Sequence, residues 1–391
     1  MPPAPPAPPL AELPRDPRAA LAAVARALDG GPALLALPPE PAAARALLDA
    51  VRPDEPLEHP GAALVVGTSG STGGPKGVVL TAAALRASGA ATAARVGTGR
   101  WLLALPLHHV AGLQVLCRSA LAGTAPVVQD LAGGFTAAGF AAATDRLGGG
   151  PRLTSLVPTQ LGRVLDDAAG RRALATYDAV LVGGAAAARP LLERAGDAGA
   201  RVVTTYGMSE TCGGCVYDGA PLDGVDVALR ADGRITLAGP VLMAGYRLRP
   251  DLTAQVLHGG RFTTGDLGRW GADGRLEVLG RADDVLVSGG ENVPLAAVEA
   301  VVAEHPGVRE ACAAGLADPE WGQVVGVAVV ATAGDPPDLD ALRALVAGRL
   351  GRAAAPRALA VVPALPLLGV GKPDRRAVAA LLAAGRMPDR G

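Results

Sequence analysis

The sequence predicts an α/β protein with a large N-terminal lobe of layered α/β subdomains, closed by a β-rich segment, and a small α+β C-terminal domain. The 391 residues exceed the size of one ordinary core, so two domains are expected. From residue 62, short apolar runs alternate with alanine-rich helical stretches. Beyond residue 225, Asp-Gly turns separate short strands, and a new pattern of helix and strand begins after residue 280.

The large lobe is expected to span residues 1–280. Residues 1–15 begin with a proline run and are predicted to be disordered, whereas residues 17–28 have helical apolar spacing that ends at a Gly pair. Four apolar runs are predicted strands of a mainly parallel sheet: AALVVG, WLLALPL, DAVLVGG and ARVVTTYG. Hairpins at Asp232–Gly233 and Asp273–Gly274 mark the β-rich closing segment.

The C-terminal domain is expected to span residues 284–391, with its boundary between Gly280 and Asp284. The segments PLAAVEAVVAEH and DLDALRALVAGRLG are predicted helices, and GQVVGVAVVATAG and ALAVVPAL are predicted strands.

Charge and composition favour small-molecule chemistry. The formal net charge is −1 and no basic block occurs, so neither nucleic acid nor an anionic membrane is an expected partner. No 18-residue apolar run or secretory leader is present, and four cysteines do not form a disulfide framework. A cytoplasmic location is therefore expected; the oligomeric state is open, with a homodimer as one outcome.

Lysine is nearly absent. Arginine carries the positive charge at every position except Lys76 and Lys372. We interpret the two lysines as sites where a compact ammonium cannot be exchanged for a planar guanidinium.

The segment from Gly67 to Gly77, GTSGSTGGPKG, lies between two apolar runs and predicts a phosphate-binding loop. Glycines let the main chain approach a polyphosphate, and hydroxyls and an ammonium supply donors. The loop is not a Walker A motif, because Pro75 precedes the lysine and Gly77 follows it. The candidate ATP-binding residues here are Thr68, Ser69, Gly70, Ser71, Thr72 and Lys76.

This loop resembles the signature of the acyl-adenylate-forming superfamily, which includes acyl-CoA synthetases and the adenylation domains of peptide synthetases. The family's further motifs follow in the expected order, over residues 62–376: LPLHHVAG, LVGGAAA, TYGMSET, GPVLMAGY, FTTGDLGR, GRADDVLVSGGENV and LPLLGVGKPDR. The resemblance implies ATP, Mg²⁺ and coenzyme A as cofactors and a carboxylic acid as substrate. The loop begins earlier than in most relatives, so much of the family's usual first subdomain is expected to be absent.

The resemblance also implies roles for residues of the large lobe. Tyr206 would stack on adenine, and Glu210 would bind Mg²⁺, a metal that prefers oxygen ligands. Asp266 would accept hydrogen bonds from the ribose, and Arg281 would donate to ribose or phosphate. The other predicted nucleotide-binding residues are Gly183, Gly184, Gly207, Met208 and Ser209.

Two half-reactions are implied for one site. Lys372, with Glu210 and Thr68, would be catalytic in adenylation, where its ammonium bridges the substrate carboxylate and the α-phosphate. The hinge is assigned to residues 281–283, with Asp283 as the hinge residue, and the C-terminal domain would be mobile about it. The predicted channel for the coenzyme A thiol is formed by Ser288, Gly289 and Gly290.

Within the family, the segments TSLVPTQL and SETCGGCVYDGAPLDGV resemble the o-succinylbenzoate:CoA ligases in their compact actinobacterial form. Such a ligase needs donors for the second carboxylate of its substrate, and the candidates are His109, Ser209 and Thr211, with Arg163 as a weaker choice. The alternatives are an aryl- or fatty-acyl-CoA ligase, a stand-alone amino-acid adenylation domain and a non-catalytic adenylate-binding protein. Against the amino-acid reading, LPLHHVAG lacks an Asp to hold an amino group. Cys212 and Cys215 are interpreted as small pocket residues, not metal ligands, because no further ligands are spaced suitably.

Overall fold

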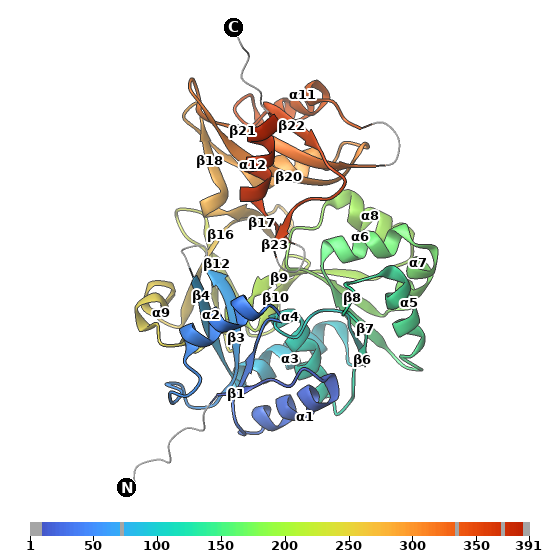
Figure 1. Ribbon diagram of the computed structural model, residues 1–391, viewed down its shortest axis with the longest axis vertical. Helices are drawn as coiled ribbons and strands as arrows, with labels where there is room; N and C mark the ends of the chain where they lie inside the picture. Colours follow the sequence, from blue (N-terminus) through green and yellow to red (C-terminus); the bar gives the residue numbers. More distant parts are fainter. Residues whose placement is uncertain (1–9, 71–73, 333–335, 369–371, 386–391) are drawn as a thin grey trace. The chain divides into compact units, whose positions relative to one another are not determined.

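The computed structural model describes residues 10–70, 74–332, 336–368 and 372–385 (Figure 1). The chain divides into two compact units. Unit 1 comprises Met1–Gly184, Ala195–Ala228 and Thr236–Thr264, and unit 2 comprises Ala185–Arg194, Leu229–Ile235 and Gly265–Gly391. This division falls after Thr264, whereas the sequence places the hinge at residues 281–283, and that hinge stays a prediction.

The first sheet of unit 1 carries the predicted phosphate loop. Its strand order is β1-β2-β3-β4-β14, with parallel pairs among the first three strands and an antiparallel hairpin between β3 and β4. Helices α1 (Pro17–Leu28) and α2 (Pro41–Val51) belong to this region; Asp16 caps α1 by accepting the amide of Ala19. The strands are β1 (Ala11–Glu12), β2 (Leu34–Ala36), β3 (Ala62–Gly70), β4 (Gly74–Thr81) and β14 (Gly245–Tyr246).

The expected disorder of residues 1–15 is wrong for residues 10–15. β1 pairs with β2, and the flanking Leu10 and Leu13 are buried. Burial of two leucine side chains and pairing of the strand offset the entropy of ordering this short segment. Residues 1–9 lie outside the described residues.

The second sheet has seven strands in the order β11-β10-β9-β8-β7-β5-β6, and the strands from β9 to β6 are parallel. Three of the four predicted apolar runs, WLLALPL, DAVLVGG and ARVVTTYG, form strands of this sheet. The prediction is wrong for AALVVG, which forms β3 of the first sheet and pairs antiparallel with β4. Helices α5, α6 and α7 cover one side, and α3 and α4 lie on the other (Figure 1). The strands are β5 (Arg100–Leu103), β6 (Val127–Val128), β7 (Arg152–Leu156), β8 (Ala179–Val182), β9 (Val202–Met208), β10 (Gly213–Tyr217) and β11 (Ala220–Pro221). The helices are α3 (Ala82–Val96), α4 (Val110–Leu121), α5 (Ala137–Asp145), α6 (Pro158–Asp166), α7 (Ala168–Leu174) and α8 (Arg189–Asp197).

The third sheet is the predicted β-rich segment. Its order is β12-β13-β16-β15, and β17 pairs with β16. Gly233 and Gly274 lie at the turns with φ of 80° and 73°, so both predicted Asp-Gly hairpins are confirmed. The elements are β12 (Asp226–Leu229), β13 (Arg234–Ala238), α9 (Pro250–Val256), β15 (Leu257–His258), β16 (Arg261–Trp270) and β17 (Leu276–Arg281).

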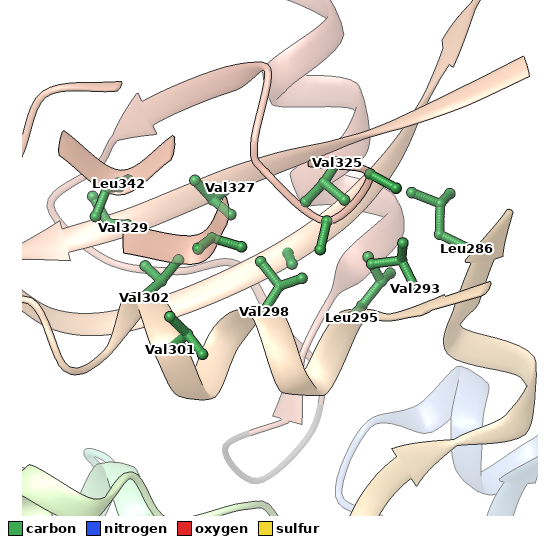
Figure 2. Packing of buried hydrophobic residues seen from close by; sticks show 14 of the residues in the cluster. Leu286, Val293, Leu295, Val298, Val301, Val302, Val325, Val327, Val329 and Leu342 are labelled. Carbon is green, nitrogen blue, oxygen red and sulfur yellow. The ribbon is translucent and has the colours of Figure 1, made fainter. Parts of the chain in front are cut away.

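Unit 2 contains a further sheet covered on both faces. Val325, Val327 and Val329 of β21 face the α10 side chains, as Figure 2 shows, whereas Val324, Ala328 and Val330 pack in a second cluster with α12. Because both faces are buried, this strand is a continuous apolar run and does not alternate with polar residues. The elements are β18 (Val285–Ser288), β19 (Glu291–Pro294), α10 (Leu295–Val302), β20 (Val308–Asp318), β21 (Gly322–Ala331), α11 (Leu339–Leu350), β22 (Ala358–Val361), β23 (Leu367–Leu368), β24 (Lys372–Pro373) and α12 (Arg375–Gly385).

Candidate functional site

The predicted phosphate loop is the connection between β3 and β4. Thr68 lies opposite Lys76 in the ladder, and the Oγ1 atom of Thr68 is buried with no hydrogen-bond partner among the described residues. A buried hydroxyl is normally satisfied, so this atom is suited to bonding a ligand. Ser71 and Thr72 lie outside the described residues, as do the side chain of Ser69 and any contacts of Gly70.

Lys76, Glu210 and Tyr246 form one cluster in unit 1. The Nζ atom of Lys76 lies 3.5 Å from Oε1 of Glu210 and 3.9 Å from the centre of the Tyr246 ring. The Tyr246 hydroxyl donates to the same Oε1 atom at 2.8 Å. Sequence reasoning missed Tyr246, although the Gly-Tyr pair that closes GPVLMAGY was a signal for it.

The cluster fits a magnesium site that is completed by phosphates. Burial, followed by the nearby Glu210 carboxylate, raises the pKa of Tyr246 well above its usual range, so the phenol stays protonated and donates. In the described part of the chain, no group of three or more His, Cys, Asp or Glu side chains could hold a metal. Mg²⁺ is commonly held by one or two carboxylates and substrate phosphates, and Glu210 would provide such a carboxylate.

A cavity opens at the carboxyl ends of the parallel strands of unit 1, the usual place for a ligand in an open α/β sheet. Two of its glycines are required by close packing: a Cβ on Gly183 would lie 2.2 Å from Oγ1 of Thr205, and one on Gly207 would lie 2.0 Å from the carbonyl oxygen of Gly213. The predicted residues Gly183, Gly184 and Gly207 all line this cavity. Its remaining lining residues are Leu105, Ala111, Gln114, Arg118, Ser155, Leu156, Val157, Leu181, Thr205, Gly214 and Tyr217.

Arg118 is the charged residue among the described residues that line this cavity, and the sequence did not single it out. It projects from α4, is 8% exposed, and donates to the Tyr217 hydroxyl at 3.3 Å. Its guanidinium lies 5.1 Å from the Trp101 ring, and its Nε atom has no hydrogen-bond partner among the described residues. No Asp or Glu is among the described residues that line the cavity with it. The apolar spacing of α4 gave no signal for an inward arginine.

Gln114 lies one turn before Arg118 on the same helix and also lines the cavity. Its amide nitrogen donates to the Cys212 carbonyl and, at 3.3 Å, to the Ser88 hydroxyl. Its Oε1 atom is buried without a partner among the described residues. Gln114 therefore offers the cavity an unused acceptor beside the unused donor of Arg118.

None of the three predicted substrate residues is among the described residues that line this cavity. His109 precedes α4, and its ring lies 4.2 Å from that of His108. Thr211 is fully buried, and its hydroxyl bonds to the Met208 and Gly213 backbone, so it holds the turn after β9. Ser209 begins that turn. The roles of His109, Ser209 and Thr211 toward substrate stay predictions.

Arg163, the weaker candidate, is exposed on α6 and does not line the cavity. Cys212 and Cys215 are buried, and burial raises the pKa of the Cys215 thiol to about 12, which disfavours a metal-binding thiolate.

The predicted ribose and hinge residues belong to unit 2. Asp266 and Arg281 lie opposite each other on β16 and β17, with a closest N–O distance of 3.8 Å. Arg281 also donates to Asp283 at 2.9 Å. A Cβ on Gly265 would lie 2.7 Å from the Arg281 guanidinium, so the neighbouring glycine makes room for that side chain.

The predicted coenzyme A residues form the turn between β18 and β19. Ser288 is buried, and Gly289 and Gly290 have φ of 55° and 86°, values that favour glycine. A Cβ on Gly289 would lie 2.5 Å from the Trp321 ring. The backbone of Lys372 is in β24, but its side chain lies outside the described residues.

Among the described helices, none is both long and apolar enough to cross a bilayer.

Tyr206 lies on β9, whose C-terminal end reaches the cavity, and Met208 ends that strand. The nucleotide-binding roles of both residues stay predictions, like the other site assignments.

Known proteins resemble this chain over most of its length. It is 50% identical over 360 residues to a probable 2-succinylbenzoate–CoA ligase of Mycobacterium tuberculosis, covering 90% of this chain and 92% of the relative. It is 36% identical to the 2-succinylbenzoate–CoA ligase of Geobacillus kaustophilus, covering 82% and 69%.

Among solved structures, o-succinylbenzoate CoA synthetase (MenE) from Bacillus subtilis with its acyl-adenylate intermediate aligns with a TM-score of 0.71 at 28% identity, covering 90% of this chain and 78% of that one. The amide bond synthetase McbA from Marinactinospora thermotolerans aligns with a TM-score of 0.75 at 31% identity, covering 94% and 84%.

Two families match in succession along the chain. AMP-binding enzyme matches residues 16–247, and AMP-binding enzyme C-terminal domain matches residues 297–372. These matches agree with the ordered motifs and with the parallel sheet that ends at a glycine-lined cavity. The chain therefore belongs to the AMP-binding enzyme family.

Proposed function

We propose that this protein is an ATP-dependent acid:CoA ligase that activates 2-succinylbenzoate as an acyl-adenylate and passes the acyl group to coenzyme A. The 50% identity to a probable 2-succinylbenzoate–CoA ligase supports both the reaction and the acid. The structural observation that carries the proposal is Arg118, a buried cation in a cavity whose described lining holds no other charged residue. The reaction is assigned to the cytoplasm, and a homodimer stays an untested prediction.

A cation buried without a carboxylate is costly, because its hydration is lost and no opposite charge replaces it. Tyr217 and Trp101 compensate Arg118 in part, through a hydroxyl and a ring face. A substrate carboxylate would complete the pairing and use the free Nε donor. 2-Succinylbenzoate has two carboxylates, so one can bind Arg118 while the other reacts.

In the first half-reaction, a carboxylate oxygen of the acid attacks the α-phosphorus of ATP, and pyrophosphate leaves. Thr68 and Lys76 would contact the phosphates, and Glu210 would hold Mg²⁺, which neutralises phosphate charge. Lys372 would stabilise the charge on the attacking carboxylate and the α-phosphate.

In the second half-reaction, the coenzyme A thiol loses its proton, its sulfur attacks the acyl carbonyl, and AMP leaves. Ser288 and the two glycines after it would line the approach of the thiol, since the glycines have no side chain and the serine has only a hydroxymethyl group. Asp283 would be the pivot that exchanges Lys372 for this turn between the two steps.

The proposal is tested by measuring pyrophosphate and acyl-CoA with 2-succinylbenzoate, benzoate, medium-chain fatty acids and amino acids. Turnover is expected with 2-succinylbenzoate. If only another acid reacts, the substrate is wrong; if none releases pyrophosphate, the chain is the non-catalytic adenylate-binding alternative. A parallel reaction with an amine in place of coenzyme A separates a ligase from an amide synthetase.

The role of Arg118 is tested in the same assay with Arg118→Gln and, as a matched control, the exposed Arg163→Gln. Arg118→Gln should raise KM for 2-succinylbenzoate by about 10-fold to 100-fold, the effect of losing a charge-assisted pair, and leave KM for ATP unchanged. Arg163→Gln should behave as the parent protein. Equal effects of the two variants would overturn the assignment of Arg118.

The assignment of Lys372 to adenylation, and not to thioester formation, is tested with Lys372→Ala. This variant should lose adenylation by several orders of magnitude yet still form the thioester from supplied acyl-adenylate. Equal loss of both steps would contradict the alternation of Lys372 with the β18–β19 turn.

A further inference from the structure

Tyr246 contacts both of the charged groups that the proposed function places at the metal and the phosphates. We propose that Tyr246 is a positioning residue for the divalent metal: its hydroxyl holds one oxygen of Glu210, so that the other oxygen faces the ion. This inference rests on the proposed function, because it assumes that metal-bound ATP occupies this site.

Tyr246 is itself held firmly. It is 4% exposed, and its strand β14 pairs with β4 so that Tyr246 lies opposite Val78. Its backbone amide donates to Oγ1 of Thr253 at 2.9 Å. A buried aromatic ring on a paired strand has little freedom, so its hydroxyl is a fixed point for any group that it bonds.

Glu210 needs such a fixed point. It lies in the short turn Ser209–Thr211 after β9, and its side chain has three rotatable bonds. Both of its side-chain contacts, from the Tyr246 hydroxyl and from Lys76, reach Oε1. Oε2 has no hydrogen bond or ion pair among the described residues. Because Mg²⁺ requires nearly ideal octahedral geometry, a carboxylate fixed through Oε1 presents Oε2 to the ion at a lower entropic cost.

The same ring holds Lys76 beside Oε1, the Glu210 oxygen that the tyrosine already bonds. The ammonium lies 3.9 Å from the ring centre and 3.5 Å from Oε1, so it contacts the tyrosine face and the oxygen that the tyrosine holds. A cation over an aromatic face is attracted to it. The two positive charges, ammonium and metal, are thereby assigned to different oxygens of Glu210, and the metal need not displace the lysine.

The test measures metal affinity directly. Mn²⁺, a spectroscopic substitute for Mg²⁺, is titrated into the protein with α,β-methylene-ATP, and free Mn²⁺ is followed by electron paramagnetic resonance. Tyr246→Phe should weaken Mn²⁺ binding by about fivefold to tenfold, the loss expected for one hydrogen bond to a charged group. The retained ring keeps Lys76 in place, so affinity for the metal-free nucleotide should change less than twofold.

The matched control is Tyr177→Phe. Tyr177 is also buried, and its hydroxyl also makes one side-chain hydrogen bond, to Thr144 at 2.8 Å, but its ring stacks on Phe140 of α5, with 5.6 Å between ring centres, and not on a residue of this cluster. Tyr177→Phe should leave Mn²⁺ affinity unchanged. In a Glu210→Gln background, Tyr246→Phe should cause no further loss, because its effect passes through that carboxylate.

Three outcomes separate the inference from its foundation. Weaker Mn²⁺ binding in Tyr246→Phe alone supports the inference. Equal Mn²⁺ affinity in Tyr246→Phe, Tyr177→Phe and the parent protein overturns it while the proposed function stands. Failure of the parent protein to bind metal and nucleotide together overturns both.

Discussion

Two buried arginines of unit 1 differ in how far the surrounding residues compensate their charge. Arg247 follows β14 and is buried with every donor group satisfied, including a 2.6 Å ion pair with Glu58. Arg118 lies on α4 and lines the cavity. Its guanidinium donates to a tyrosine hydroxyl and lies near a tryptophan ring, and its Nε donor has no partner among the described residues. The other acceptors of Arg247 are the carbonyl oxygens of Val51, Arg52, Glu55 and Pro56.

This difference shows that burial of a charged side chain does not by itself distinguish a structural role from a functional one. Arg247 closes the segment after α2 against the first sheet, so its charge is compensated within the fold. Arg118 is compensated only in part, and the deficit faces a cavity. Burial alone would rank the two residues together, whereas the state of their hydrogen bonds distinguishes an arginine whose donors are all used within the fold from one with an unused donor.

The largest expected effect is on stability at Arg247. Arg247→Met should lower the free energy of unfolding by about 3–5 kcal/mol, because Glu58 and the carbonyl groups lose their shared donor. Urea unfolding followed by circular dichroism measures the change, with the exposed Arg163→Met as the control at about 0.5 kcal/mol or less. A loss below about 1 kcal/mol would show that the network contributes little.

Arg118→Met tests whether the charge of Arg118 stabilises the fold as that of Arg247 does. A hydrophobic side chain of similar volume relieves a buried charge that lacks a carboxylate, so stability should stay within about 1 kcal/mol of the parent or rise. The same urea experiment measures it. A destabilisation as large as that of Arg247→Met would mean that Arg118 is also a structural residue.

Gly289→Ala extends the comparison to unit 2. The added Cβ would lie against the Trp321 ring, and the residue has positive φ, so the turn should shift. Acyl-CoA formation from supplied acyl-adenylate should fall about 10-fold or more, the loss seen for a misplaced reacting group, while pyrophosphate release is retained. Gly348→Ala is the control, since nothing lies near its Cβ position. Equal loss in both half-reactions would argue against a thiol channel at this turn.

The smallest effect concerns pH. Burial lowers the pKa of His108 below 6.5, with Glu40 opposing the shift. The unfolded chain therefore binds a proton at His108 more tightly than the folded chain does. The contribution of His108 to the free energy of unfolding is fully present above pH 6.5 and is lost as the pH decreases below it. Unfolding at pH 7.5 and 5.5 should show a loss of under about 1 kcal/mol that His108→Gln removes. An unchanged difference in that variant would assign the loss to other groups.

The family, the two-part organisation and the positions of the motifs could all be predicted from the amino-acid sequence. Glycine turns, hydroxyl-rich loops and near-absent lysines are local signals, because backbone conformation and side-chain chemistry depend on adjacent residues. Hairpins at the Asp-Gly pairs and the parallel strands were predicted for the same reason. The ordered conformation of residues 10–13 was not predicted, since it depends on pairing with a strand more than twenty positions away.

Which side chains contact one another could be seen from the tertiary structure alone. Tyr246 and Glu210 are far apart in sequence and meet through one hydrogen bond, and Arg118 becomes a cavity residue because α4 turns one face toward the sheet. Burial and unsatisfied donors are properties of packing between distant segments, so no local pattern encodes them.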